Sequence, residues 1–326
     1  MNSSRMDDAR WPTRGTLLEA YSVYRQMPGP APRSPRASAG VAALLFGLTL
    51  LSTLAVGAQI ALAYAANRAA DIGDFNPYAL MFRHPSLLRA GLPFALTLMG
   101  ILLAHELGHY FACRYYGIAA SYPYFIPAPT LIGTLGAFIR IRAPILNRRA
   151  LFDVGLAGPV VGFLFALPAL IAGILTSKSV PAGTVSDGVV FGNPLLVRLL
   201  MVILRPGLSP EHLLLNPIGR AAWVGLLATA LNLLPAGQLD GGHIVYALAP
   251  AYHRSVSLVV VLLLLPLAYL WPGWLLWAAL LLLIGFRHPP LLDPYSSLDR
   301  VRLIWAWIGL AIFLLCFTPA PFSLAR

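Results

Sequence analysis

The stretch LLAHELGHYFACRYYG, residues 102–117, places three ionisable side chains at the end of an apolar run that begins near Leu92. On a helix, His105 and His109 lie one turn apart on the same face, so both imidazoles can bind one ion. Glu106 lies at the edge of that face, where it can contact a water on the ion without binding the ion itself. The H-E-x-x-H pattern therefore predicts a helix that carries two ligands of a zinc site.

The composition is that of a membrane protein, because 58% of the 326 residues are hydrophobic and only 11% are charged. Crossing the hydrocarbon core takes about 20 helical residues, and several apolar segments approach that length. These segments are residues 41–66, 90–112, 152–176, 217–236, 256–271, 273–286 and 301–318. The pair around Pro272 and Gly273 is short, which leaves two tilted helices or a hairpin open. The predicted fold class is an all-α polytopic membrane protein, a bundle of about six to eight transmembrane helices.

Basic residues concentrate in the loops and tails and give the chain a net charge of +11. In a membrane protein such charges set the orientation by the positive-inside rule, so we expect no nucleic-acid partner. With residues 1–40 and 113–151 on the cytoplasmic side, the N-terminus is cytoplasmic, and segments 90–112 and 217–236 run in the same direction. We divide the chain into a flexible N-terminal segment (1–40), a transmembrane core with the motifs (41–250) and C-terminal transmembrane helices (251–326).

Two stretches between the apolar segments carry structural signals of their own. Residues 119–150 contain several prolines and a β-branched middle interrupted by glycines, which predicts a short membrane-associated β-hairpin or a re-entrant loop. Residues 193–206 fit an amphipathic helix lying in the membrane interface and fit a plain connector packed on the bundle equally well.

A site with two histidines needs a third protein ligand, and the acids that border apolar segments are few. Asp240 is expected at the inner end of segment 217–236, on the same side of the membrane as His109, and it is our choice. Asp153 begins a different segment directly after two arginines, which favours an ion pair or a role at the helix N-terminus.

Two further residues are candidate ligands. Cys113 continues the face of His105 and His109 but lies two turns from His105, about 12 Å along the axis, so we expect a packing thiol. His243 follows Asp240 by three residues and either contacts the ion or supports the ligands from outside.

The motif AHELGH at 104–109 occurs together with NLLPAGQLDGGH at 232–243, GTLGAFIRI at 133–141 and GLAGPVVG at 155–162. As a set, these motifs resemble the site-2 protease family of intramembrane zinc metalloproteases, peptidase family M50. The second signature of that family is met by Asn232, Pro235, Leu239, Asp240 and Gly241.

The resemblance implies one zinc ion per chain, bound by His105, His109 and Asp240. Glu106 would be the catalytic base, and Asn232 would hold the substrate backbone or the oxyanion. The hairpin would receive an unwound substrate segment as an added strand. The substrate-binding residues expected on this basis are Gly133, Gly136, Ala137, Phe138, Asn232 and Pro235.

The resemblance also implies a partner set and a location. The expected partners are a transmembrane protein substrate, the lipid bilayer and an unidentified regulatory membrane partner, in a bacterial cytoplasmic membrane. The main alternative is a transporter or channel that uses the same histidine and acid cluster for ion or proton binding. No repeat symmetry of the kind found in transporters is evident in the sequence. An iron enzyme and an inactive scaffold fit less well, because the seven histidines are scattered and the predicted zinc set is intact.

Overall fold

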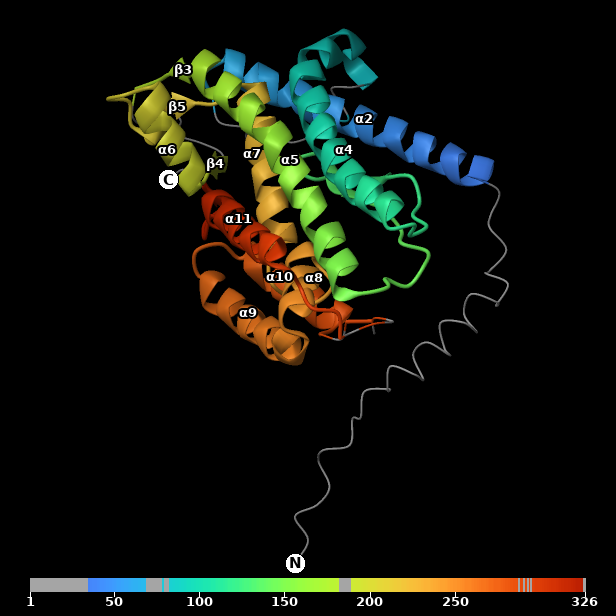
Figure 1. Ribbon diagram of the computed structural model, residues 1–326. Coiled ribbons are helices and arrows are strands. Elements are labelled where there is room, and N and C mark those ends of the chain that lie inside the picture. The colour runs from blue at the N-terminus through green and yellow to red at the C-terminus, as the bar shows by residue number, and fades with distance from the viewer. Residues whose placement is uncertain are drawn as a thin grey trace, which may run out of the picture.

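Long helices packed side by side dominate the chain in the computed structural model (Figure 1). The structure describes residues 35–68, 78, 82–181, 189–286, 288, 289, 291, 293 and 295–324. Most of the predicted flexible N-terminal segment, residues 1–34, lies outside the described residues. In the described part the strands are short and pair only in twos, so the predicted all-α membrane fold is confirmed.

Each predicted apolar segment contains a helix. These helices are α2 (Pro35–Ala65), α4 (Leu92–Tyr115), α5 (Arg148–Thr176), α7 (Pro217–Asn232), α9 (His253–Leu267), α10 (Gly273–Ile284) and α11 (Arg300–Cys316). Two shorter α-helices are α6 (Leu195–Leu204) and α8 (Asp240–Leu248), and the 3-10 helices are η1 (Pro85–Gly91), η2 (Pro210–His212) and η3 (Pro250–Tyr252). The helix at α6 confirms the helical reading of residues 193–206.

Among the described residues, four helical stretches are long and apolar enough to cross a membrane. They are Ala39–Ala65, Pro85–Tyr115, Arg148–Thr176 and Pro250–Leu267. By contrast, α10 has 12 residues and is about 18 Å long, which is shorter than a hydrocarbon core of about 30 Å. It packs back against α9, so the two form a helical hairpin, one of the arrangements that the sequence left open.

The centre of the molecule is formed by α4, α5 and α7 (Figure 1). Helix α5 packs along α4 and also along α7. The close approach of α4 and α5 depends on glycine, since a Cβ atom at Gly108 would lie 2.6 Å from the carbonyl oxygen of Ala157. Small residues at this contact therefore decide how near α5 comes to the face of α4 that carries the histidines.

The predicted β-hairpin is present between α4 and α5. Strand β1 (Tyr124–Pro127) pairs antiparallel with β2 (Thr134–Phe138), with Phe125 opposite Ala137. Helix α2 packs against β1, so the hairpin is covered by protein on that side. The other pairs are short: β3 (Lys178–Ser179) with β5 (Leu213–Leu214), and β4 (Val189–Phe191) with β6 (Phe322–Leu324).

The predicted ion pair of Asp153 is confirmed, and its partner comes from the far end of the chain. Arg302 on α11 donates from Nε to Asp153 Oδ1 at 2.9 Å and from Nη2 to Oδ2 at 2.5 Å. The hydroxyl of Tyr116, directly after α4, also donates to this carboxylate. Burial and this bond raise the pKa of Tyr116 to about 12, so the phenol remains a donor at neutral pH. These contacts tie the ends of α4, α5 and α11 together.

Candidate metal centre

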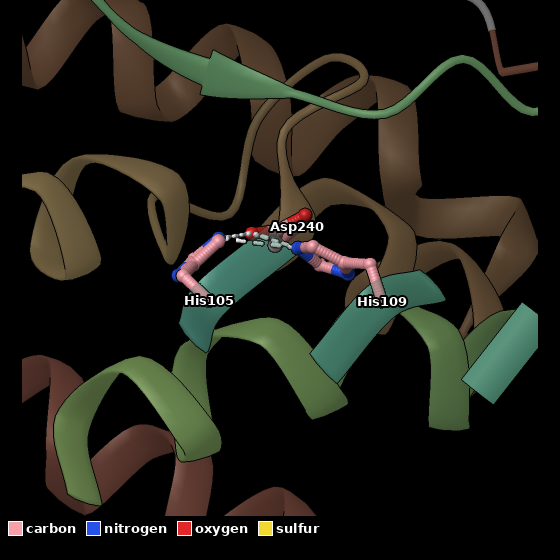
Figure 2. Close-up of side chains that lie close together, drawn as sticks. All are labelled: His105, His109 and Asp240. Atoms are coloured by element: carbon pink, nitrogen blue, oxygen red, sulfur yellow. Dashed lines mark hydrogen bonds and ion pairs between the residues drawn. The ribbon is translucent and has the colours of Figure 1, made fainter. Parts of the chain in front are cut away.

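Three predicted ligands converge on one point between α4 and α8 (Figure 2). The Nε2 atoms of His105 and His109 lie 3.1 Å apart, and each lies 3.3 Å from Oδ2 of Asp240. Both histidines are buried. Within the described residues, no other group of at least three histidine, cysteine or acidic side chains has this arrangement.

The spacing of these three atoms fits a zinc ion. Zinc binds histidine nitrogen and carboxylate oxygen at about 2.0–2.2 Å with tetrahedral geometry, so neighbouring ligand atoms in such a site lie about 3.3–3.6 Å apart. The observed separations of 3.1–3.3 Å lie at or slightly below the lower end of that range. Two imidazoles and one carboxylate leave the fourth position for water or substrate, as in catalytic zinc sites.

Helix α5 fixes the orientation of His109. Its Nδ1 donates to the carbonyl oxygen of Val154 at 2.7 Å, because a carbonyl can only accept. The neutral ring then has its bare Nε2 directed toward Asp240, which is the form that binds a metal. Glycines make room for the two rings: a Cβ atom at Gly158 would lie 2.1 Å from Nε2 of His109, and one at Gly162 would lie 3.0 Å from Nδ1 of His105.

Asp240 reaches the site by a route that the sequence did not predict. It is the first residue of α8 rather than the inner end of the helix from 217, because α7 ends at Asn232 and a turn follows. Gly237 in this turn has a φ of +56°, which favours glycine. Gly241 lies so close to the carbonyl of Leu233 that a Cβ atom would be 2.1 Å from its oxygen.

The position of α8 is also set by Arg148 at the start of α5. Its Nε donates to the carbonyl of Ala247 at 2.6 Å, and its Nη2 donates to the carbonyl of Leu248 at 2.7 Å. A guanidinium at the C-terminal end of a helix satisfies carbonyls that have no partner within the helix. One end of α8 is thus held by α5, while its other end presents Asp240.

Glu106 lies beside the three ligands without joining them. Its side chain is buried, and the backbone of Ile139 lies near its carboxylate. Because Ile139 follows β2 directly, this proximity places the end of the hairpin next to Glu106. Asn232 at the end of α7 also reaches the cluster, with Nδ2 at 3.3 Å from Nε2 of His105.

The predicted substrate-binding residues of the hairpin are in two different environments. Gly133 is buried against α2, where its carbonyl accepts from Ser52 Oγ at 2.6 Å. Gly136 faces open space, and Phe138 exposes 45% of its surface. Leu135, which the sequence did not single out, exposes 67%. Pro235 instead borders an apolar groove of about 380 Å³ between α8 and α11.

The two other candidate ligands, Cys113 and His243, lie outside the metal-binding cluster. Cys113 is fully buried in apolar surroundings, as expected for a packing thiol. His243 contacts His288, with 2.8 Å between its Nδ1 and Nε2 of His288, and the ring of His288 stacks on Tyr246. This histidine pair was missed, since the two residues are 45 positions apart and share no motif.

A sequence model described as "Peptidase family M50" matches residues 93–268, a range that contains every residue of the cluster. The chain belongs to peptidase family M50. As the resemblance implied, it is therefore a member of the site-2 protease family, and this membership does not favour the transporter or channel alternative.

Two similar proteins come from plants. The chain is 38% identical over 178 residues to the probable zinc metalloprotease EGY2, chloroplastic, of Oryza sativa subsp. indica, covering 54% of this chain and 32% of the relative. It is 30% identical over 303 residues to the probable zinc metalloprotease EGY1, chloroplastic, of Arabidopsis thaliana, covering 86% of this chain and 53% of the relative. The chain thus spans about a third to a half of the length of these relatives.

Proposed function

We propose that the protein is an intramembrane zinc metalloprotease that hydrolyses a peptide bond within or next to a transmembrane segment of another membrane protein. The observation that carries this proposal is the 3.1–3.3 Å spacing of ligand atoms from His105, His109 and Asp240, next to the buried carboxylate of Glu106. Membership of family M50 and the zinc metalloprotease names of the relatives support the same chemistry.

The proposed roles follow from where each side chain lies. A single zinc ion held by His105, His109 and Asp240 would supply a Lewis acid that makes water acidic and polarises a carbonyl. Glu106 accepts the proton of the attacking water and returns it to the leaving amine. Asn232, whose amide nitrogen lies 3.3 Å from Nε2 of His105, donates to the substrate backbone or to the oxygen that gains charge.

The hairpin is proposed to hold the substrate. Peptide carbonyls in a transmembrane helix are hydrogen-bonded, so the segment must unwind before water can attack it. In the described residues β2 pairs only with β1, and it ends next to Glu106 through Ile139. An unwound segment added along β2 would recover its lost backbone bonds beside the proposed base. Gly136, Ala137 and Phe138 would then contact the substrate.

The site is proposed to lie inside the bilayer toward the cytoplasmic side. His105 precedes Arg114 by nine residues, about 13 Å along α4, and the basic loops support an orientation with the N-terminus on the same side. Plant relatives are named as chloroplastic, which gives no support to the bacterial cytoplasmic membrane expected from the sequence.

The test is cleavage of a panel of single-span membrane substrates by the reconstituted protein, with bound metal measured in the same samples. We expect about one zinc per chain in the wild type and in Glu106→Gln. Cleavage by Glu106→Gln should fall by about 10²–10⁴-fold, because the amide cannot take a proton from water. His109→Ala should lose both metal and cleavage.

His212→Gln is the matched control, because His212 lies in η2 and outside the cluster. It should keep the metal content and cleavage of the wild type. The proposal fails if the wild type holds no metal, or if Glu106→Gln cleaves as fast as the wild type.

A further inference from the structure

A polar cavity lies at the end of α5 that is farther from the metal centre. It has a volume of about 540 Å³ and is lined by α6 and the loop that follows, residues 205–210. Among the lining residues that the structure describes, the polar side chains are those of Asn193, Arg198, Arg205 and Ser209, and the two charged ones are both arginines. The cavity is therefore suited to an anion.

Contacts of Arg205 place this cavity at the end of α5. Its Nη2 donates to the carbonyls of Leu175 and Ser177 at 2.8 Å each, where α5 ends. Helix α5 has 29 residues and is about 43 Å long, which exceeds a hydrocarbon core of about 30 Å, so we expect its end to lie among lipid headgroups. The carbonyl that orients His109 belongs to Val154 near the opposite end.

Helix α6, which carries Arg198, has apolar side chains both on the side that faces the bundle and on the outer side. Leu196, Val197 and Met201 are buried against the bundle. On the outer side, Val202 exposes 73% and Ile203 exposes 71% of their surfaces. Contact of this outer side with lipid chains would remove the apolar surface from water.

The arginines keep hydrogen-bonding capacity for a ligand. Arg198 donates from Nε to the carbonyl of Asn193 at 3.2 Å, and Arg205 uses Nη2 for the end of α5. A guanidinium carries several N–H donors in a planar fork that matches phosphate oxygens. A hydroxyl at Ser209 adds a neutral donor to the same cavity.

We propose that this cavity binds the phosphate of an anionic phospholipid, whose acyl chains lie along the outer side of α6 against Val202 and Ile203. The positive lining selects the headgroup charge, and the adjoining apolar surface distinguishes a lipid from a free phosphate. Such a lipid would fix α6 at the interface and brace the end of α5.

The test uses the full chain purified in a neutral detergent and titrated with dioctanoyl phosphatidylglycerol, dioctanoyl phosphatidylcholine or glycerol 3-phosphate. Native mass spectrometry measures binding, and thermal unfolding without ligand confirms that each variant is folded. We expect the wild type to bind phosphatidylglycerol at least about tenfold more tightly than phosphatidylcholine. Both lipids carry the phosphate, but the choline cation of phosphatidylcholine offsets the phosphate charge and is repelled by the arginines. Glycerol 3-phosphate alone should bind far more weakly than the lipid.

Arg198→Gln should abolish the preference for phosphatidylglycerol, and Arg198→Lys should retain part of it through charge alone. Arg254→Gln is the control, since Arg254 is an exposed arginine on α9 outside the cavity. Ile203→Ser should weaken the lipid and leave glycerol 3-phosphate unchanged. The proposal is overturned if both lipids bind equally, if Arg254→Gln loses as much as Arg198→Gln, or if glycerol 3-phosphate binds as tightly as phosphatidylglycerol.

Discussion

His109 has its ring fixed by residues that lie far away in the sequence. Val154 accepts from Nδ1, and Gly158 leaves the space that the ring occupies, both on α5. An imidazole that binds a metal depends on the partner of its second nitrogen for tautomer and direction. The affinity of the site for metal therefore depends on α5 as well as on the ligands themselves.

Gly158→Ala tests this dependence at the residue scale. The new methyl group would lie 2.1 Å from Nε2 of His109, so the ring must leave its position in the cluster. We expect metal affinity to fall by at least about tenfold, as measured by competition with a zinc chelator.

Gly100→Ala is the matched control on α4, because a Cβ atom there meets no atom within 4 Å. It should bind zinc like the wild type. Equal zinc affinity of Gly158→Ala and Gly100→Ala would contradict the role assigned to α5.

At the scale of the element, strand β2 combines exposure with proximity to the proposed base. Leu135 and Phe138 are exposed, while the strand continues into Ile139, whose backbone lies near the carboxylate of Glu106. Folding favours the burial of apolar side chains such as these, so their exposure calls for another explanation. Exposed apolar surface on a strand edge is suited to receiving another chain. The proposed substrate strand would use the backbone of β2.

Phe138→Pro tests the strand, because proline removes one backbone N–H and restricts φ. We expect cleavage to fall while the zinc content stays at the wild-type level, since Phe138 is not a ligand. The measurement is turnover of a single-span substrate together with metal analysis.

Phe138→Leu keeps the backbone N–H and serves as the control for loss of the aromatic ring. The role proposed for β2 would be wrong if proline and leucine at this position had the same effect, or if Phe138→Pro cleaved normally.

At the scale of the whole molecule, contacts between distant segments set the relative positions of the helices. Arg302 on α11 binds Asp153 on α5, and Tyr116 joins them from the end of α4. The side chains of Arg302 and Asp153 expose 20% and 29% of their surfaces, so water screens this pair only in part. Loss of one partner leaves the other with an unpaired charge in a partly buried position.

We expect Arg302→Gln and Asp153→Asn each to reduce the free energy of unfolding by about 1–2 kcal/mol. This value lies between the small contribution of an exposed ion pair and the larger cost of breaking a buried one. The measurement is denaturant-induced unfolding in detergent, arranged as a double-mutant cycle. The double variant should be destabilised by less than the sum of the single variants, because the second change removes an already broken pair. Additive effects would show that the two side chains act independently.

The sequence determined the features that depend on short-range spacing. Apolar segments of about 20 residues predicted the helices, and the spacing of four positions from His105 to His109 placed two imidazoles on one face of α4. Prolines and glycines between α4 and α5 predicted the hairpin. Asp240, the predicted third ligand, joins the cluster of His105 and His109, but it begins α8 after a turn and does not end the helix from 217.

Only the tertiary structure decided the contacts between residues far apart in the chain. The bond of His109 to Val154, the pairing of Arg302 with Asp153 and the contact of His243 with His288 join positions separated by 45, 149 and 45 residues. A helix has the same spacing wherever it occurs, so local geometry can be read from the sequence. Which faces of two helices meet depends on the packing of all side chains between them, such as the glycines that let α5 approach α4.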